Sequence, residues 1–238
     1  MAGPADLESD SIRLGGAEGR HASTVRRMEP GERVDLTDGA GQLAECVVTA
    51  ASAGVLQLAV LARRTQARPD PALTVIQAIA KGDRGEQAVE TMTEVGVDIV
   101  VPWQAERCVA RWRGDRADRP LARWRATAVQ AAKQSRRAWF PEVTEPAGTA
   151  VAAERVRAAD LALLLDPEAP ASLAGTAIPA RGSIVLIVGP EGGISPAESD
   201  LLRAAGATGV RLGPTVLRAS SAGAVAAGLV LGRSPRWA

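Results

Sequence analysis

The chain has 238 residues, enough to bury two hydrophobic cores, and its formal net charge of +1 excludes a uniformly basic nucleic-acid-binding protein. Its single histidine, His21, excludes a histidine-rich metal site and leaves a Ser-His-Asp triad only as a remote alternative to an exposed side chain. Cys46 and Cys108 form no CxxC pair, so the sequence predicts no disulfide framework and no metal site, and it indicates a reducing cytoplasm.

The N-terminal segment MAGPADLESDSIRLGG contains acidic residues and has no apolar run typical of a secretory signal. No stretch of the sequence is apolar for long enough to span a bilayer. We therefore expect a protein that is not exported and not bound to a membrane.

Residues 1–71 are expected to form a small β-barrel or β-rich domain with a linker at its end. Short apolar runs at 33–36, 45–49 and 55–60 alternate with glycine-containing turns, which is the pattern of hairpin-connected strands. The segment Arg63–Pro71 is polar, carries two prolines and lacks periodicity, so we predict it as the linker.

Residues 72–238 have the alternating pattern of an α/β domain with a mainly parallel sheet flanked by helices. A strand is predicted at 73–80, a helix at 84–95 that Gly96 ends, and a strand at 97–101. A further helix is expected at about 119–137, and the continuous apolar runs at 161–165 and 183–188 predict central strands.

The segment Ser183–Asp200 joins a buried strand to a Gly-Pro-Glu-Gly-Gly loop and then to a helix. Ser195, Pro196 and Glu198 predict a capping box with proline at the first helical position. The loop lacks the GxGxxG spacing and the lysine of the common nucleotide-binding loops, so it indicates a ligand other than NAD or ATP. Glycines let the backbone approach a ligand closely, although a tight loop without a ligand is an alternative.

The segment Gly209–Gly232 repeats this arrangement with a short strand, a Gly213-Pro214 turn and a helix that begins near Ser220 or Ser221. The helix is almost entirely small or aliphatic, which predicts close packing against the sheet or against a second subunit. An ordinary core helix explains most of these residues but does not explain Arg218.

These two motifs, VGPEGGIS and LGPTVLR followed by a small-residue helix, resemble the RsmE family of SPOUT methyltransferases, which methylate uridine N3 in 16S ribosomal RNA. Similar residues are found upstream at 81–84, 93–97, Gln134-Ser135 with Arg137, and 25–31. The resemblance implies a PUA-like N-terminal β-barrel, a C-terminal SPOUT domain with a deep trefoil knot, a homodimer and the small ribosomal subunit as partner. It implies no metal and no membrane association.

The resemblance also implies that S-adenosyl-L-methionine binds among three loops. The cofactor-binding residues would be Leu165, Asp166, Pro167, Val188, Gly189, Pro190, Glu191, Gly192, Gly193, Ile194, Leu212, Gly213, Val216 and Leu217. The sequence departs from the family where Ser220-Ser221-Ala222 replaces Glu-Thr-Ala and where Thr91-Met92 replaces Lys-Ala.

Two basic clusters are candidates for RNA binding. Ten Lys or Arg residues lie between Arg107 and Arg137 against only Asp115 and Asp118, with four tryptophans in or beside this stretch. Arginine pairs with phosphate and, like tryptophan, stacks on exposed bases, although a solvated helix face with inward tryptophans is an alternative. The expected RNA-binding residues are Arg20, His21, Arg26, Arg27, Arg107, Arg111, Arg123, Arg136 and Arg137.

Arg218 and Glu191 are the candidate catalytic residues. Arg218 would stabilise the uracil anion or a nearby phosphate, with a structural salt bridge as its alternative. Glu191 would position the cofactor or accept a proton, with capping of loop amides as its alternative. The rival functions are methylation of another RNA (transfer RNA or 23S ribosomal RNA), a non-catalytic RNA-binding assembly factor, and a nicotinamide-dependent dehydrogenase, which the absent fingerprint disfavours.

Overall fold

The computed structural model describes residues 7–112 and 117–237, which fall into two compact units. The first unit contains the chain up to Arg68 together with Arg137–Trp139, and the second contains Pro69–Arg136 and the chain from Phe140 onward. The first six residues, Asp115 and two arginines of the basic stretch lie outside the described residues. Within the described ranges, no helix is both long and apolar enough to cross a membrane.

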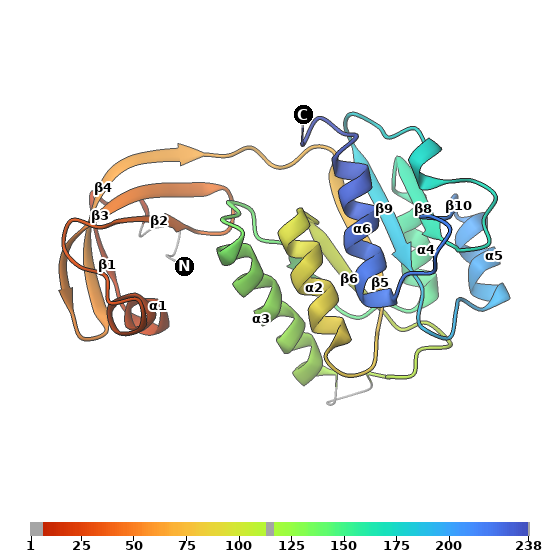
Figure 1. Cartoon of the computed structure of the whole chain (residues 1–238), viewed down its shortest axis with the longest axis horizontal. Helices are drawn as coiled ribbons and strands as arrows, with labels where there is room; N and C mark the ends of the chain where they lie inside the picture. Colours follow the sequence, from red (N-terminus) through yellow and green to blue (C-terminus); the bar gives the residue numbers. More distant parts are fainter. Residues whose placement is uncertain (1–6, 113–116, 238) are drawn as a thin grey trace. The chain divides into compact units, whose positions relative to one another are not determined.

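The first unit is built on a four-stranded antiparallel sheet with the order β1-β4-β3-β2 (Figure 1). Its strands are β1 (Ser11–Leu14), β2 (Arg33–Thr37), β3 (Gln42–Ser52) and β4 (Val55–Thr65). Buried and exposed residues alternate along β1, and its Ile12 and Leu14 join a core cluster with Leu56 and Leu58 of β4. A helix α1 (Gly16–Arg20) and a π-helix η2 (His21–Val25), which the sequence did not predict, follow β1.

The predicted linker is wrong at its start, because β4 continues through Thr65. Arg63 pairs with Ala44 of β3, and its guanidinium donates to the Leu7 carbonyl at 2.8 Å and to the Asp10 carboxylate at 2.8 Å. These tertiary contacts hold a polar segment in the sheet, which its composition does not reveal.

The second unit contains a six-stranded sheet in which all neighbouring strands are parallel, with the order β10-β8-β9-β5-β6-β7. The strands are β5 (Ala72–Ala78), β6 (Ile99–Trp103), β7 (Glu142–Val143), β8 (Leu161–Leu165), β9 (Ser183–Val188) and β10 (Thr208–Val210). The helices are α2 (Arg84–Val95), α3 (Asp118–Gln134), α4 (Thr149–Arg157), α5 (Pro196–Ala204) and α6 (Ala219–Leu231), with a short 3-10 helix η4 (Leu173–Gly175).

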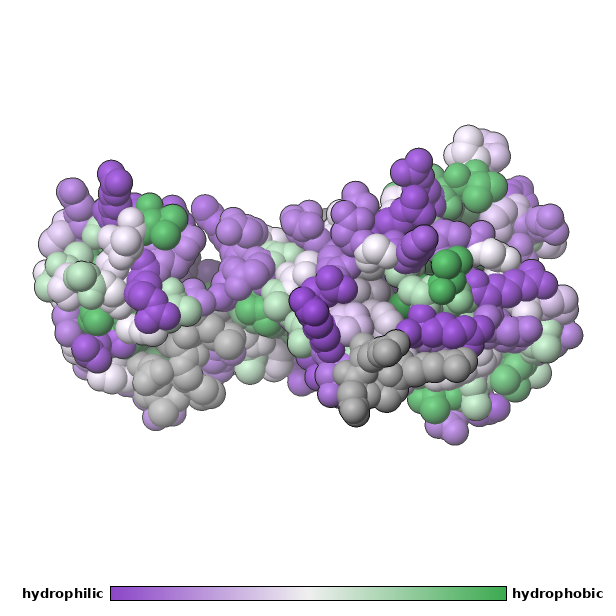
Figure 2. Space-filling model, turned by 90° about the horizontal axis from the view of Figure 1, so that it is seen from below, coloured by the Kyte–Doolittle hydropathy of each residue, from purple (hydrophilic) through white to green (hydrophobic). Residues whose placement is uncertain are grey.

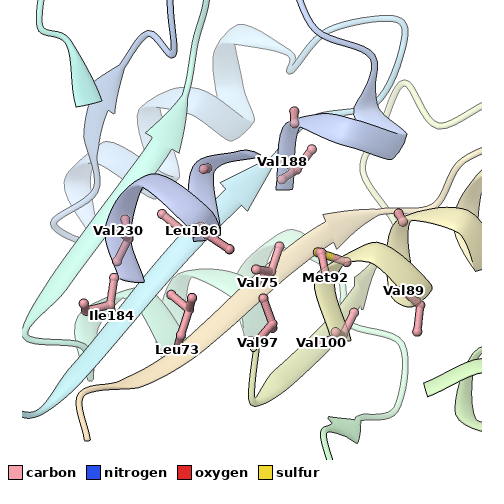
Figure 3. Close-up of a cluster of buried hydrophobic side chains, with 14 of the residues drawn as sticks. Leu73, Val75, Val89, Met92, Val97, Val100, Ile184, Leu186, Val188 and Val230 are labelled. Carbon is pink, nitrogen blue, oxygen red and sulfur yellow. The ribbon is translucent and has the colours of Figure 1, made fainter. Parts of the chain in front are cut away.

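The two faces of this sheet carry separate apolar clusters. Leu73 and Val75 of β5 pack with Met92 of α2 and Val230 of α6 on one face (Figure 3). Ile76 and its neighbours in β6, β8 and β9 pack with α4 and α5 on the other face. Strands that are buried on both faces explain why their sequences are continuously apolar.

Several predicted elements are confirmed, and others differ in their bounds. The strand predicted at 73–80 is β5 at 72–78, the strand predicted at 97–101 is β6 at 99–103, and one helix is shorter than predicted. The strands at 161–165 and 183–188 and the helix at 84–95 have the predicted bounds, and Gly96 ends α2 with a φ of 117°. The helix α3 ends at Gln134, because Arg136 adopts a left-handed conformation with a φ of 54° and the chain turns there.

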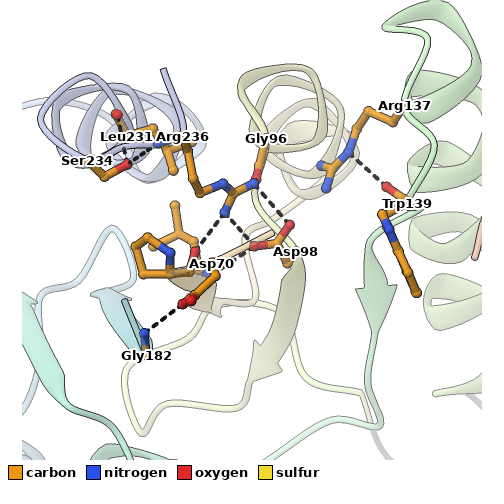
Figure 4. A network of polar contacts seen from close by, with 11 residues as sticks. Asp70, Gly96, Asp98, Arg137, Trp139, Gly182, Leu231, Ser234 and Arg236 are labelled. Carbon is orange, nitrogen blue, oxygen red and sulfur yellow. Dashed lines mark hydrogen bonds and ion pairs between the residues drawn. The ribbon is translucent and has the colours of Figure 1, made fainter. Parts of the chain in front are cut away.

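Arg236, which follows α6, binds the segments that precede β5 and β6 (Figure 4). Its guanidinium donates to the Asp98 carboxylate at 2.6 and 3.2 Å, to the Gly96 carbonyl at 2.8 Å and to the Pro71 carbonyl at 3.1 Å. The Asp98 carboxylate also accepts the N–H of Leu73 at 2.9 Å. The Arg236 clamp therefore joins segments that precede β5, precede β6 and follow α6.

Candidate functional site

A cavity of about 850 Å³ lies at the carboxyl ends of β8, β9 and β10, where ligands bind in parallel α/β sheets. Thirteen of the fourteen residues expected at the cofactor site line this cavity, and the exception is Gly192. Glu168 and Thr215, which belong to the loops expected around the cofactor, line the cavity too. The lining further includes residues without a predicted role in it, namely Arg84, Arg107, Leu164, Pro196, Ser199, Ala219, Ser220 and Ala222.

Residues 189–194, here called the glycine loop, form one wall of the cavity. Gly193 has a φ of 75°, a conformation that side-chain-bearing residues rarely adopt, and its N–H donates to the Pro190 carbonyl at 2.9 Å. A Cβ on Gly189 would lie 2.7 Å from the side chain of Ile194, which folds back over it. The glycines therefore permit a compact loop at the cavity wall.

The glycine loop leads into the predicted capping box of α5, which is confirmed. The Ser195 hydroxyl accepts the N–H of Glu198 at 3.4 Å, and the Glu198 carboxylate accepts the N–H of Ser195 at 3.3 Å. The other carboxylate oxygen of Glu198 accepts the N–H of Glu106 at 2.9 Å and the hydroxyl of Thr149 at 2.7 Å. This buried carboxylate thus fixes the glycine loop to the segment after β6 and to the start of α4.

Residues 212–218, here called the proline loop, form another wall. Val216 is 76% exposed, and Leu217 is also exposed although both residues line the cavity. The carbonyl of Arg218 accepts the N–H groups of Ser221 and Ala222, which starts α6. Among the described residues no carboxylate lies within 4.0 Å of the Arg218 guanidinium, so the structure gives no support to a structural salt bridge there.

The two positions that depart from the family pattern also lie at or near this wall. Ser220, at the position where the resemblance implies an acidic residue, is buried and lines the cavity. Met92 is fully buried and its sulfur would lie 2.8 Å from a Cβ placed on Gly223. Met92 therefore fills the space between α2 and α6.

Charged side chains reach the cavity from several segments. Arg84 begins α2, Arg107 follows β6 and Arg218 precedes α6. The Arg84 Nη1 lies 3.6 Å from Oε1 of Glu191, and the Arg107 Nη1 donates to the Gly192 carbonyl at 3.4 Å. Asp166, on the loop after β8, is instead paired with Arg203 at 3.0 Å.

The predicted RNA-binding residues are distributed over both units. Arg20, His21, Arg26 and Arg27 are exposed on the first unit, at α1, η2 and the turn after them. Arg107, Arg111, Arg123 and Arg136 are exposed on the second unit. Arg137 belongs to the first unit, where its Nε donates to the Trp139 carbonyl at 2.9 Å (Figure 4).

The tryptophans beside the basic stretch are mostly core residues rather than stacking surfaces. Trp103 and Trp124 are fully buried, and Trp112 packs edge-on against Trp124 with ring centroids 5.0 Å apart. The inward-packing alternative is therefore correct for Trp103 and Trp124.

In the view of Figure 2, hydrophilic residues cover much of each unit and hydrophobic residues are scattered among them.

Neither metal binding nor thiol chemistry is indicated at the cavity. The described part of the chain contains no group of three or more His, Cys, Asp or Glu side chains that could hold a metal ion. Burial raises the pKa of the Cys46 and Cys108 thiols, which keeps them protonated at neutral pH. The polar side chains that line the cavity are those of arginines, carboxylates, Ser199, Thr215 and Ser220.

Comparisons with known proteins identify the class and then the family. A model described as an RNA methyltransferase domain matches residues 68–231, and one described as an RNA methyltransferase PUA domain matches residues 14–61. The chain is 49% identical over 226 residues to "Ribosomal RNA small subunit methyltransferase E" of Mycobacterium tuberculosis, which covers 93% of this chain and 86% of the relative. The chain therefore belongs to the family of ribosomal RNA small subunit methyltransferase E.

Two solved structures show the same fold over almost the whole chain. Ribosomal RNA small subunit methyltransferase E from Neisseria gonorrhoeae, bound to S-adenosyl methionine, superposes with a TM-score of 0.81 at 29% identity and covers 93% of this chain and 91% of its own. A putative methyltransferase from Legionella pneumophila, also with bound SAM, has a TM-score of 0.82 at 26% identity and covers 94% and 92%. The predicted α/β fold with an N-terminal PUA-like domain is confirmed.

Proposed function

We propose that this chain transfers a methyl group from S-adenosylmethionine to N3 of a uridine in the 16S ribosomal RNA of the small subunit. The observation that carries the proposal is the cavity at the carboxyl edge of the sheet, which residues of both the glycine loop and the proline loop line. Its volume of about 850 Å³ is in the range of cavities that enclose small ligands.

The residues present fit S-adenosylmethionine. Leu165, Val188 and Ile194 with Leu212 and Val216 offer apolar surface for the adenine, and the glycine loop offers backbone groups to the polar parts. The cofactor supplies an electrophilic methyl group on a sulfonium. The protein's own contribution is to hold both partners in line and to exclude water from between them.

Arg218 and Glu191 carry the proposed catalytic roles. The N3 proton of uracil must leave, so negative charge develops on the base, and the exposed Arg218 guanidinium at the cavity wall would stabilise this charge or a neighbouring phosphate. Glu191, which also lines the cavity, would orient the cofactor or accept the proton. The basic residues of the two units named above would hold the RNA through its phosphates.

A homodimer is part of the proposal. The helix α6 exposes Val225 and Leu229, and Trp237 beyond it is 55% exposed, so this apolar side of α6 is suited to pack against a second copy. We also propose the cytoplasm as its location, because ribosomal subunits are found there.

The experiment is transfer of labelled methyl from S-adenosylmethionine to purified small ribosomal subunits that lack the modification, with the product nucleoside identified by mass spectrometry. N3-methyluridine at one site is the expected result. Arg218→Ala should abolish transfer and leave cofactor binding, measured by calorimetry, nearly intact. Transfer only to transfer RNA or 23S RNA, or cofactor binding with no transfer to any RNA, would contradict the proposal.

A further inference from the structure

Three arginines that are far apart in the sequence reach the same cavity. Arg84 is the first residue of α2, Arg107 lies in the segment after β6, and Arg218 precedes α6. Arg84 has no place among the RNA-binding or catalytic residues that the sequence predicts. Its side chain is 50% exposed while it lines the cavity, so it lies where the cavity opens to solvent.

The charge of these arginines is only partly balanced. The nearest carboxylate oxygen to Arg84 is Oε1 of Glu191 at 3.6 Å, which is longer than a hydrogen bond, and a guanidinium has five N–H donors. Arg107 uses one donor on the Gly192 carbonyl at 3.4 Å. The other carboxylates of the cavity, Asp166 and Glu168, lie together on the loop after β8, where Asp166 is already paired with Arg203.

Beside Glu191 and Gly192, two guanidinium groups, those of Arg84 and Arg107, therefore meet one carboxylate. Most of their N–H donors have no partner among the described residues, so they are free to bind an anion. A phosphate accepts two parallel N–H groups from one guanidinium, and this geometry is stronger and more specific than a single contact at 3.6 Å. RNA brings phosphates to the cavity whenever its target base enters, because each base carries its own backbone with it.

We infer that Arg84 binds a backbone phosphate of the RNA strand next to the target uridine, an inference that rests on the proposed function. In the free protein its guanidinium lies beside Glu191. In the complex it pairs with the phosphate and holds the nucleotide in register with the cavity. Arg84 is thus a substrate-positioning residue, and it reads no base.

The test compares Arg84→Gln and Arg84→Lys with the wild type, and Arg157→Gln on α4 is the control for loss of one exposed positive charge away from the cavity. Filter binding of each protein to unmodified 16S RNA is measured over a range of salt concentrations. Cofactor affinity is measured by calorimetry, and KM for small subunits is measured by methyl transfer.

Arg84→Gln should weaken RNA binding and raise KM for the subunit by about 10-fold or more, because a charge-assisted contact is lost. The slope of log K against log salt should become shallower by about 0.7 to 0.9, the value for one phosphate. Arg84→Lys should keep most of the slope and lose part of the affinity. Cofactor affinity should stay within about twofold, and Arg157→Gln should resemble the wild type.

Two results would overturn the inference. Equal loss of cofactor affinity with an unchanged salt slope would assign Arg84 to the carboxylate of S-adenosylmethionine instead. If the slope, KM and cofactor affinity all stay unchanged, the contact between Arg84 and Glu191 has no role in RNA binding or cofactor binding. The binding slope needs no turnover, so a wild-type protein that binds 16S RNA without methylating it would contradict the proposed function and still decide the role of Arg84.

Discussion

The glycine loop and the proline loop line the same cavity, but the protein holds them differently. The glycine loop runs into Ser195 and Glu198, whose buried carboxylate accepts hydrogen bonds from two other segments. In the part of the chain that the structure describes, Leu212 to Leu217 form no hydrogen bond, and Val216 is 76% exposed. Side-chain hydrogen bonds therefore hold the glycine loop to other segments, whereas the proline loop is held mainly by the packing of Leu212 against the core.

The largest expected effect tests the glycine loop. Glu198→Ala removes the acceptor for Ser195, Glu106 and Thr149 and leaves buried and part-buried donors unpaired, which should cost about 3 kcal/mol of unfolding free energy. The glycine loop should then lose its shape, and cofactor affinity should fall by about 10-fold or more. Urea unfolding and calorimetry measure the two effects.

Val216→Ser is the matched change on the proline loop. Because its side chain is exposed, we expect the unfolding free energy to change by less than about 0.5 kcal/mol. Cofactor affinity should still fall several-fold, because Val216 lines the cavity and would lose apolar contact with the ligand. Equal destabilisation by Glu198→Ala and Val216→Ser would show that the two walls are held alike.

A smaller effect distinguishes the glycines of the two loops. Gly193→Ala places a Cβ on a residue with a φ of 75° and should cost about 1 kcal/mol of unfolding free energy. Gly213→Ala meets no atom within 4 Å and has no left-handed backbone, so its stability should match the wild type. Thermal unfolding of both variants checks this, and a Gly213 variant as unstable as the Gly193 variant would contradict it.

The smallest effect lies at the opposite edge of the sheet, where the strands begin. The Ser183 hydroxyl and the Ser183 N–H both donate to the Asp160 carboxylate at 2.8 Å, and they lower the pKa of that carboxyl. The ionised Asp160 carboxylate therefore contributes its full stability above the pKa that Asp160 has in the unfolded chain. This contribution is lost as the pH falls through the lower pKa of the folded state.

Asp160→Asn should remove this contribution, so the stability difference from the wild type should be greatest near neutral pH and vanish in acid. Urea unfolding at several pH values measures it. Cofactor affinity should not change, because the described lining of the cavity does not include Asp160. A loss of cofactor affinity would mean that the two edges of the sheet are coupled.

The sequence predicts contacts between neighbours better than contacts between distant segments. Ser195 and Glu198 are three residues apart, so their capping box was visible as a pattern. The bonds from Glu106 and Thr149 to Glu198 were not visible, because they depend on how the segment after β6 and α4 pack. In the same way, thirteen of the fourteen residues expected from the two motifs and the loop after β8 line the cavity. Arg84 and Arg107 were not expected there, because tertiary packing brings them to the cavity.

Residue composition was a poor guide where the prediction depended on which side of a strand or helix a residue faces. The polar residues after Leu61 indicated a linker, yet β4 holds the chain through Thr65. Trp103 and Trp124 stood beside arginines, which left both an RNA-stacking surface and inward packing open, and both residues are buried. A tryptophan in a basic stretch is ambiguous, because helix and strand positions that face the core and those that face solvent differ by a single step along the chain.

The Arg236 clamp bears on the kinetics of folding. Arg236 and Asp98 are separated by 138 residues. The central strand β5 pairs with β9, which begins much later in the sequence, at Ser183. Contacts between such remote segments close large loops, which is an entropic cost that slows folding. We expect the clamp to form late, after the rate-limiting step, so that it governs how slowly the folded unit opens rather than how fast the unit assembles.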